Sequence, residues 1–201
     1  RAAMYRKTGK RVIDVFLSIC GLIVCAIPML IIAILIKMDS KGPVLFKQER
    51  LGKDQKIFTI YKFRSMCQGA YEIGGIVKRS DDKRITRVGA FLRRTSLDEL
   101  PQMFNIIRGD MAIVGPRPIL PWEFYDYQNN SRYCRRYDVL PGLFCSIDID
   151  YRASADRNLQ FEMDAEYARN ITFFNDLKLF SGVIKTVISG KNVYCEEIQK
   201  K

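Results

Sequence analysis

Histidine is absent from this chain of 201 residues. Its absence excludes Ser-His-Asp and Cys-His catalysis, as well as zinc sites that need imidazole ligands. The six cysteines contain no Cys-x-x-Cys pair, so we interpret them as reduced thiols of a cytoplasmic chain that mostly fill apolar space. Neither a Gly-x-x-x-x-Gly-Lys-Ser/Thr loop nor a Gly-x-Gly-x-x-Gly loop occurs. A nucleotide would therefore be bound by other means.

Positive charge is in excess. The chain has 33 lysines and arginines against 22 acidic residues, which leaves a formal net charge of +11. Such an excess suits nucleic acid, an anionic membrane surface or phosphorylated substrates. The length allows one ordinary domain but hardly two, and no internal repeat or low-complexity tract is visible.

A run of 25 residues from Val12 to Ile36 is apolar except for Asp14 and Ser18. Its hydropathy predicts a membrane helix, and a cleavable signal peptide fits poorly because no small-residue cleavage site follows. Pro28 interrupts the run, and a proline inside a helix kinks or breaks it. The arm before Pro28 would be about 24 Å long and the arm after it about 13 Å, so neither crosses a hydrocarbon core of about 30 Å.

Basic residues lie on both sides of this run, so the positive-inside tendency does not choose an orientation. A re-entrant helix that enters the cytoplasmic leaflet and returns to it satisfies both ends. A helix that crosses the bilayer once is the alternative.

The most informative segment runs from Arg93 to Pro118. It places two adjacent carboxylates, Asp98 and Glu99, between pairs of arginines, which are Arg93 and Arg94 before them and Arg108 and Arg117 after them. Arginine forks suit phosphate oxygens, and a carboxylate can act as the nucleophile in phosphoryl transfer. This pattern indicates a site that holds phosphates while a carboxylate attacks them.

Structural explanations compete with this interpretation. Residues 96–99 fit a capping box, with Ser96 at the N-cap and Glu99 reaching back. A helix that starts nearer Asp98 accommodates Pro101 better and leaves both carboxylates at the positive end of its dipole. Arg117, fixed between two prolines, suits a phosphate clamp, although Pro-Arg-Pro is equally compatible with a plain turn.

Further elements follow from periodicity and turn residues. We expect two strands at 44–46 and 57–63, a polar loop at 67–84, a strand at 111–114, and a helical pattern from 161 to 188 that stops at Gly190. Helical spacing predicts that Leu97, Leu100, Phe104 and Ile107 face a core, in a helix that ends at Gly109. The aromatic and basic residues of 119–138 suit either a membrane interface or an amphipathic helix packed on the domain.

Several motifs follow one another along most of the chain. They are Lys10-Arg11-x-x-Asp14, Pro28, Gly42-Pro43-Val44-x-Phe46-x-Gln48, Tyr61-Lys62-Phe63-Arg64-Ser65-Met66, Ser96-Leu97-Asp98-Glu99-Leu100-Pro101-Gln102, Gly109-Asp110-Met111, Gly115-Pro116-Arg117-Pro118 and Pro141-Gly142. Each is weak by itself, but the ordered set is specific. With these residues the chain resembles the bacterial sugar transferases, the small monotopic phosphoglycosyl transferases that begin glycoconjugate assembly.

The resemblance implies that a sugar 1-phosphate moves from a UDP-sugar to undecaprenyl phosphate and that UMP leaves. By resemblance, Asp98 is the nucleophile that forms a covalent phosphosugar intermediate, and Glu99 assists the attack of the lipid phosphate or orients the metal. Mg²⁺, bound through Asp98 and phosphate oxygens, would offset the charge repulsion between acid and diphosphate. The residues that match positions near the substrate phosphates are Lys62, Arg93, Arg117 and Arg152.

Together, the residue patterns and the resemblance predict an α+β fold. We expect a single small, mostly helical domain with a short β-hairpin, joined to an N-terminal re-entrant membrane helix kinked at Pro28. Residues 1–40 would form the membrane helix with its basic flanks, and residues 41–201 the cytoplasmic catalytic domain at the membrane interface. The resemblance implies a monotopic protein of the bacterial inner membrane, with its active site on the cytoplasmic face and an N-acetylated amino sugar as the family-based choice of sugar.

One segment departs from the family pattern. After Pro-Gly, relatives commonly continue with a Gly-Trp-Ala-Gln-Val-Asn-Gly-Arg type segment, whereas this chain reads Leu143-Phe144-Cys145-Ser146-Ile147-Asp148-Ile149-Asp150-Tyr151-Arg152. Arg152 keeps the expected place, but the approach to it is rebuilt, which concerns nucleotide and sugar recognition more than the chemistry. The serine often found before the kink proline is replaced by Ile27.

Two other functions stay open at this point. A basic, membrane-anchored module without catalysis would bind anionic lipid or nucleic acid with steep salt dependence, but it leaves the acid pair and Pro-Arg-Pro unexplained. A catalytically idle relative would bind lipid without releasing UMP. We expect membrane lipids as partners and no nucleic acid, while the pathway and the oligomeric state, including a homo-oligomer, do not follow from the sequence.

Overall fold

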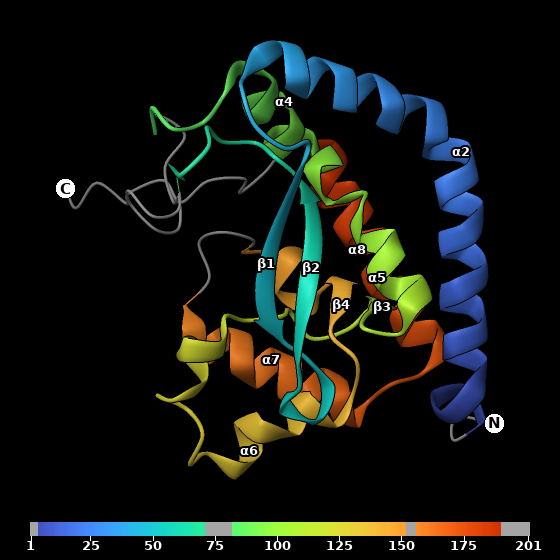
Figure 1. Ribbon diagram of the computed structural model, residues 1–201. Coiled ribbons are helices and arrows are strands. Elements are labelled where there is room, and N and C mark those ends of the chain that lie inside the picture. Colours follow the sequence, from blue (N-terminus) through green and yellow to red (C-terminus); the bar gives the residue numbers. More distant parts are fainter. Residues whose placement is uncertain (1–3, 71–81, 152–155, 190–201) are drawn as a thin grey trace.

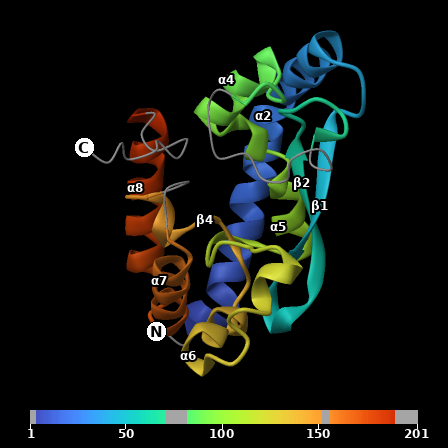
Figure 2. The same ribbon diagram turned by 90° about the vertical axis from the view of Figure 1, so that its left-hand side faces the viewer.

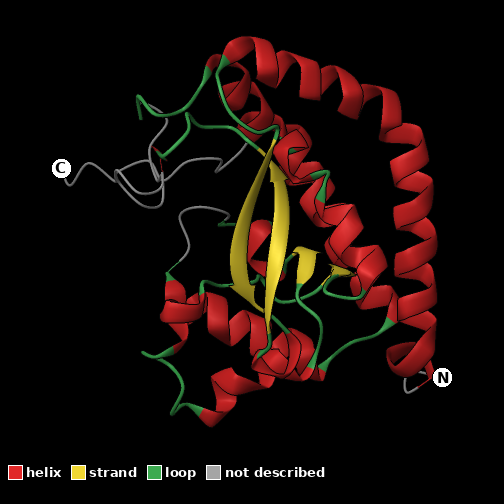
Figure 3. Cartoon of the chain, viewed as in Figure 1, coloured by secondary structure: helices red, strands yellow, loops and turns green. Residues whose placement is uncertain are grey.

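The computed structural model describes residues 4–70, 82–151 and 156–189. Helices make up most of these residues, and the strands are confined to one hairpin and one short pair (Figure 3). The elements are α2 (Lys10–Asp39), β1 (Leu45–Leu51), β2 (Ile57–Phe63), α4 (Arg87–Thr95), α5 (Gln102–Arg108), β3 (Ala112–Val114), α6 (Ser131–Cys134), β4 (Gly142–Phe144), α7 (Arg157–Arg169) and α8 (Phe173–Ser189). The predicted α+β class is confirmed.

The apolar run forms the bent helix α2. It rises along one side of the molecule and then turns sharply across the top (Figure 1), and Pro28 lies inside it. Its large apolar side chains are exposed on both arms, among them Val12, Phe16, Ile23, Val24, Ile27, Leu30, Ile31 and Met38. Within the described residues, α2 is the helix that is long and apolar enough to cross a membrane.

The end of α2 is fixed by Arg64, directly after β2. This buried guanidinium donates to the carbonyls of Ser40 (2.7 Å), Lys41 and Ile36, at the end of the helix where carbonyls run out of helical partners. The Ile36 carbonyl also accepts from the backbone N–H of Ser40. Asp39 accepts a hydrogen bond from the backbone N–H of Val88 at 2.9 Å. The second arm is therefore tied both to the hairpin and to the start of α4.

The first turn of α2 is fixed as well. Lys10 Nζ lies 2.6 Å from Oδ2 of Asp176 in α8, and the hydroxyl of Tyr5 donates to the same oxygen at 2.7 Å. Arg11 donates to the carbonyls of Ile106 and Ile107 in the last turn of α5. Both ends of the bent helix are thus held against the same domain.

The predicted hairpin is present. Strands β1 and β2 pair antiparallel from Leu45↔Phe63 to Leu51↔Ile57, so β1 is longer than the expected strand at 44–46. The fully buried Asn105 fixes α5 against β2, because its Oδ1 accepts from the N–H of Tyr61 at 3.0 Å and its Nδ2 donates to the carbonyl of Thr59 at 2.7 Å. In Figure 2 the hairpin lies on one side of the molecule and α7 and α8 on the other, with α2 and α5 between them.

Two close backbone contacts need glycine. A Cβ atom on Gly89 in α4 would lie 1.9 Å from the carbonyl oxygen of Ser65, so only glycine lets α4 lie against the segment after β2. A Cβ atom on Gly142 would lie 2.0 Å from the nitrogen of Gly115. That contact, together with the parallel pairing of β3 and β4, places Pro116-Arg117-Pro118 beside β4.

Some sequence predictions were wrong. Phe104 is 48% exposed instead of facing the core, because a 3-10 turn at Leu97–Glu99 precedes α5 and breaks the helical phase that the spacing assumed. The pattern from 161 to 188 is divided between α7 and α8. Gly109 ends α5 as predicted, with a left-handed φ of 100°.

The aromatic segment 119–138 does not form one amphipathic helix. It consists of short helical pieces, and its side chains contribute to a core cluster formed by Leu51, Ile119, Tyr137 and Phe161 with Phe124, Tyr127 and Tyr133 around it. Trp122 and Tyr125 are exposed. Gly190 and most of the loop predicted at 67–84 lie outside the described residues.

Candidate active site

The acid pair lies on a tight turn between two helices. Asp98 and Glu99 belong to the 3-10 turn Leu97–Glu99, which Ser96 enters with a left-handed φ of 58°. The Ser96 side chain makes no cap hydrogen bond, so the capping box proposed for it does not form. A helix starting near Asp98 is also wrong, because α5 begins after Pro101, which occupies its N-cap position. The turn is a connection that displays both carboxylates beside the hairpin.

Lys62 approaches this turn from β2. Its Nζ lies 2.6 Å from Oε1 of Glu99, and both side chains are about three-quarters buried. The turn and β2 are in contact along this edge. The pair is a charge-assisted hydrogen bond, which is shorter and stronger than a neutral one. Lys62 therefore joins the hairpin to the acid pair.

Burial raises the pKa of Asp98 to about 6, and the negative charge of Glu99 acts in the same direction. The positive charges of Lys62 and of Arg93, in the last turn of α4, lower it. Asp98 is thus a partly buried carboxylate that two cations keep mostly ionised at neutral pH. A strongly perturbed carboxyl group among fixed cations is typical of a functional site.

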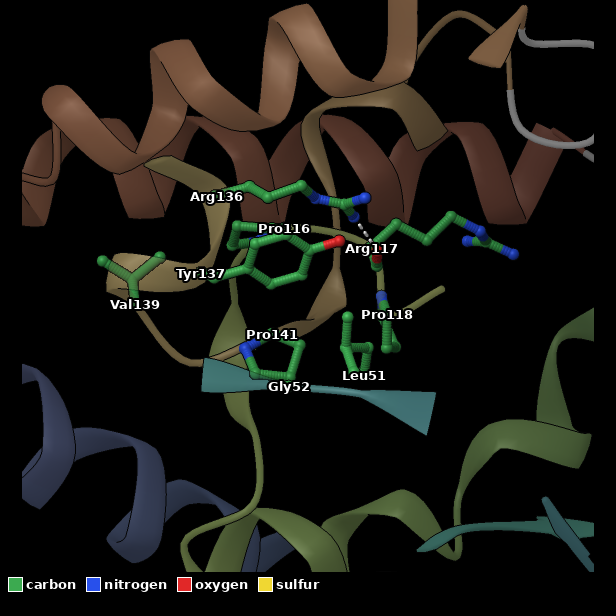
Figure 4. A pocket seen from close by; sticks show the side chains of 9 residues that line it. All are labelled: Leu51, Gly52, Pro116, Arg117, Pro118, Arg136, Tyr137, Val139 and Pro141. Carbon is green, nitrogen blue, oxygen red and sulfur yellow. Dashed lines mark hydrogen bonds between the residues drawn. The ribbon is translucent and has the colours of Figure 1, made fainter. Parts of the chain in front are cut away.

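Arg117 reaches the same site from the loop after β3. Its side chain is 38% exposed, and its Nη1 lies 2.8 Å from Oδ1 of Asp148. The negative charges of Asp148 and Glu99 raise the pKa of Arg117. Figure 4 shows the small pocket behind this loop, lined by residues that include Pro116, Pro118 and Arg136; the Arg117 side chain points away from it. The guanidinium is therefore directed toward Asp148 and not into the pocket.

The predicted site residues fall into three groups. Lys62, Arg93 and Arg117 come from three separate elements. Lys62 pairs with Glu99, the charges of Lys62 and Arg93 act on Asp98, and the charge of Glu99 acts on Arg117. Arg152 lies outside the described residues. Pro28 lies inside the bent helix α2, away from the acid pair in the sequence, and a proline at such a position kinks a helix.

Two arginines of the informative segment do not point to the acid pair. Arg94 is exposed on α4. Arg108 donates to the hydroxyl of Tyr61 at 3.1 Å, and its Nε lies 3.6 Å from Asp110. Its side chain is 63% exposed, so it belongs to the outer surface of the hairpin.

Sequence reasoning missed three residues that support Arg117. Asp148 binds its guanidinium, Asp164 accepts from its backbone N–H at 3.2 Å, and Arg136 donates to its carbonyl. They lie 19 to 47 residues away in the chain, and no local spacing connects them to Arg117. One feature of the sequence pointed to Asp148, namely that it falls in the segment that departs from the family pattern.

The carboxylates suit a metal only in part. In the described residues no group of three or more histidine, cysteine or acidic side chains is placed to hold an ion. Mg²⁺ commonly takes one or two carboxylates and completes its shell with water and substrate phosphates. Asp98 and Glu99 therefore fit a magnesium ion that arrives with a phosphorylated substrate, and do not fit an all-protein cage.

Several known proteins are similar to this chain along most of its length. The chain is 51% identical over 193 residues to the exopolysaccharide production protein PSS of Rhizobium leguminosarum bv. phaseoli, covering 90% of this chain and 96% of that protein. It is 37% identical over 186 residues to a UDP-N-acetylgalactosamine-undecaprenyl-phosphate N-acetylgalactosaminephosphotransferase of Aeromonas hydrophila, covering 90% of this chain and 44% of that protein.

A third relative is the undecaprenyl-phosphate galactose phosphotransferase of Salmonella typhimurium, 33% identical over 204 residues, with 92% of this chain and 41% of that protein covered. The chain thus spans less than half the length of the Aeromonas and Salmonella relatives. The family model described as bacterial sugar transferase matches residues 5–190, and the chain therefore belongs to the bacterial sugar transferase family.

Proposed function

We propose that this protein transfers a sugar 1-phosphate from a UDP-sugar to undecaprenyl phosphate and releases UMP, as the first membrane step of glycoconjugate assembly. The observation that carries the proposal is the partly buried Asp98, whose raised pKa is countered by the charges of Lys62 and Arg93. Arg117 is a third cation of the site, on which the charge of Glu99 acts. The relatives named as undecaprenyl-phosphate sugar phosphotransferases support the same reaction.

Asp98 is the nucleophile in this proposal. A carboxylate oxygen of Asp98 attacks the phosphorus next to the sugar, and the bond from that phosphorus to the bridging oxygen breaks, so that UMP leaves with this oxygen. An oxygen of undecaprenyl phosphate then attacks the same phosphorus, the bond to Asp98 breaks, and the carboxylate is regenerated. No proton has to move in either step if the groups are ionised, which agrees with the absence of histidine.

The cations around Asp98 hold the phosphates and offset their charge. Arg93 and Arg117 come from opposite sides of the acid pair along the chain, and each presents a fork of donors that matches phosphate oxygens. Lys62 is already bound to Glu99 at 2.6 Å, so it orients that carboxylate for the lipid phosphate or the metal. Arg152 is proposed as a further phosphate ligand from the resemblance alone.

Mg²⁺ is proposed as the cofactor, with Asp98 as its ligand and Glu99 beside it. The ion supplies charge neutralisation between the acid pair and the diphosphate. The protein supplies two adjacent carboxylates and leaves the other positions to phosphate and water.

We propose that residues 1–40 enter the inner membrane as a re-entrant helix and that residues 41–201 lie on its cytoplasmic face. The bend in α2 and the attachment of both its ends to one domain support this topology. We propose that exposed apolar side chains of α8 also face the membrane, namely Phe173, Phe174, Leu177 and Ile188.

Cysteine labelling tests the topology. In a variant without native cysteines, single cysteines at Thr8 and Lys41, on either side of the apolar run, are expected to react with a membrane-impermeant reagent only from the cytoplasmic side. Reaction of either position from the periplasm would refute the re-entrant arrangement.

UMP release tests the reaction. Purified protein with Mg²⁺, undecaprenyl phosphate and a panel of UDP-sugars, led by N-acetylated amino sugars, is expected to release UMP with at least one donor. Asp98→Asn should abolish release, and Glu162→Gln, which changes a partly exposed carboxylate on α7, should not. With the lipid omitted, label from the sugar phosphate should stay on Asp98. Full turnover of Asp98→Asn would defeat the proposal, and salt-sensitive binding of nucleic acid without UMP release would favour a non-catalytic module.

A further inference from the structure

Arg117 is held by a carboxylate that takes no part in the proposed chemistry. Asp148 is 6% exposed, and its two carboxylate oxygens bind different partners. Oδ1 lies 2.8 Å from Nη1 of Arg117, and Oδ2 accepts from the backbone N–H of Cys145 at 3.2 Å. Because a buried carboxylate that loses its partners is strongly unfavourable, Asp148 keeps the guanidinium in place.

The backbone of Arg117 is fixed independently of its side chain. Asp164 accepts from the Arg117 N–H at 3.2 Å, and Arg136 donates to the Arg117 carbonyl (Figure 4). Arg136 and Asp164 also form an ion pair of 2.8 Å, and both side chains are almost completely buried. The flanking prolines restrict the same segment. The backbone contacts therefore fix the direction in which the Arg117 side chain leaves the loop. The ion pair with Asp148 fixes the position of the guanidinium at its far end.

The guanidinium remains accessible to a ligand. One nitrogen is bound to Asp148, and 38% of the Arg117 side chain is exposed. A guanidinium has five donors in a planar fork, so binding through one nitrogen leaves another edge for a phosphate. The negative charge of Glu99 raises the pKa of Arg117, so the acid pair belongs to the electrostatic surroundings of this guanidinium.

We propose that Asp148 is a positioning residue for the donor substrate, which holds one edge of Arg117 so that the other edge binds the diphosphate of the UDP-sugar. This inference rests on the proposed function. When Arg152 is aligned with the arginine of the Gly-Trp-Ala-Gln-Val-Asn-Gly-Arg type segment, Asp148 stands at the glutamine. A carboxylate binds the guanidinium more strongly than an amide does, because both groups are charged. In this chain Arg117 is therefore ordered before the substrate arrives, which lowers the entropic cost of binding it.

The test is Asp148→Asn in the full chain, with the KM values for both substrates, kcat, and the Kd of UDP in the presence of Mg²⁺. The variant keeps the shape and an acceptor for Cys145 but removes the charge. We expect the KM for the UDP-sugar and the Kd of UDP to rise about tenfold, with the KM for undecaprenyl phosphate unchanged. Glu123→Gln is the matched control, since Glu123 is equally buried and pairs with Arg157. It should leave KM and Kd unchanged even if it lowers the Tm.

A double-mutant cycle separates positioning from general damage to the fold. Because Asp148 acts through Arg117, adding Asp148→Asn to Arg117→Ala should weaken UDP binding no further. Wild-type KM and Kd in Asp148→Asn would overturn the inference, and so would fully additive losses. If the wild type released no UMP from any donor, the proposed function would fail, while the UDP affinities would still decide whether Asp148 positions Arg117.

Discussion

Asp98→Asn is expected to make the protein more stable while it removes activity. Burial and Glu99 raise the pKa of Asp98 from 3.8 to about 6 in the folded state. The folded state therefore binds a proton more tightly than the unfolded state, so stability is lost as the pH rises from about 4 through 6. A difference of about two pKa units corresponds to about 3 kcal/mol at pH 8. Asparagine has the same shape and no charge, so it removes this penalty.

The gain should depend on pH in a defined way. It is largest above about pH 7, about half as large at pH 5 and small near pH 4, because the pH then approaches the pKa of the unfolded state and the two states bind similar numbers of protons. For a chain of this size, about 3 kcal/mol corresponds to a rise in Tm of about 6 °C or more. The measurement is thermal unfolding of both proteins in the same detergent at pH 5 and pH 8, without Mg²⁺ or substrate.

Glu162→Gln provides the control for the loss of a carboxylate. Its carboxyl group pairs with Arg132 on the surface, where ion pairs contribute little, so its Tm should follow the wild type at both pH values. If Asp98→Asn melted at or below the wild-type temperature at pH 8, Asp98 would not be held at an energetic cost. A gain of equal size at pH 5 and pH 8 would likewise contradict the reasoning.

Three further outcomes follow from the same structure. Gly89→Ala should unfold the protein or lower its Tm strongly, because the added Cβ would lie 1.9 Å from a carbonyl oxygen. Gly9→Ala, whose added Cβ has its nearest contact at 3.6 Å, should be neutral. Thermal melts followed by circular dichroism compare the two variants, and equal Tm values would refute the close contact at Gly89. Arg64→Ala should lower the free energy of unfolding, measured by chemical denaturation, by about 2–4 kcal/mol, because it frees buried carbonyls at the end of α2. Arg108→Ala, which changes an exposed arginine, should lower it little. Equal losses in the two variants would argue against the role of Arg64 at the end of α2. The kcat/KM for the UDP-sugar should fall below about pH 6 as Asp98 takes up a proton, and a profile flat down to pH 5 would exclude Asp98 as the nucleophile.

Features set by local chemistry could be predicted from the sequence. The apolar run with Pro28 indicated a bent helix, and the alternation around residues 57–63 indicated the strand that carries Lys62. Gly109 marked the end of α5, since a left-handed residue there favours glycine. The sequence thus predicts the strand that carries Lys62 and the end of the helix that follows the acid pair.

Features that depend on distant contacts could not be predicted. The left-handed backbone at Ser96 changes the phase of the helix that follows, so Phe104 turns outward although its spacing suited a core. Asp148 and Asp164 hold Arg117 from 31 and 47 residues away, and a one-dimensional pattern carries no information about such contacts. The roles of Asp98, Glu99, Lys62, Arg93, Arg117 and Arg152 remain predictions for the assays above.

The attachment of α2 at Arg64 has a practical consequence for anyone who wants a water-soluble version of this protein. Lys62 and Arg64 are two residues apart on one stretch of chain, and one binds Glu99 while the other closes the last turn of the apolar helix. Deleting that helix would remove the Ile36 carbonyl that Arg64 binds and free the segment that carries the Ser40 and Lys41 carbonyls. It would also expose the Phe63 and Leu92 cluster beneath the helix. Truncation would thus disturb the edge that carries Lys62 and Glu99 along with the apolar helix, and solubility is better sought by replacing the exposed apolar residues of α2 with polar ones.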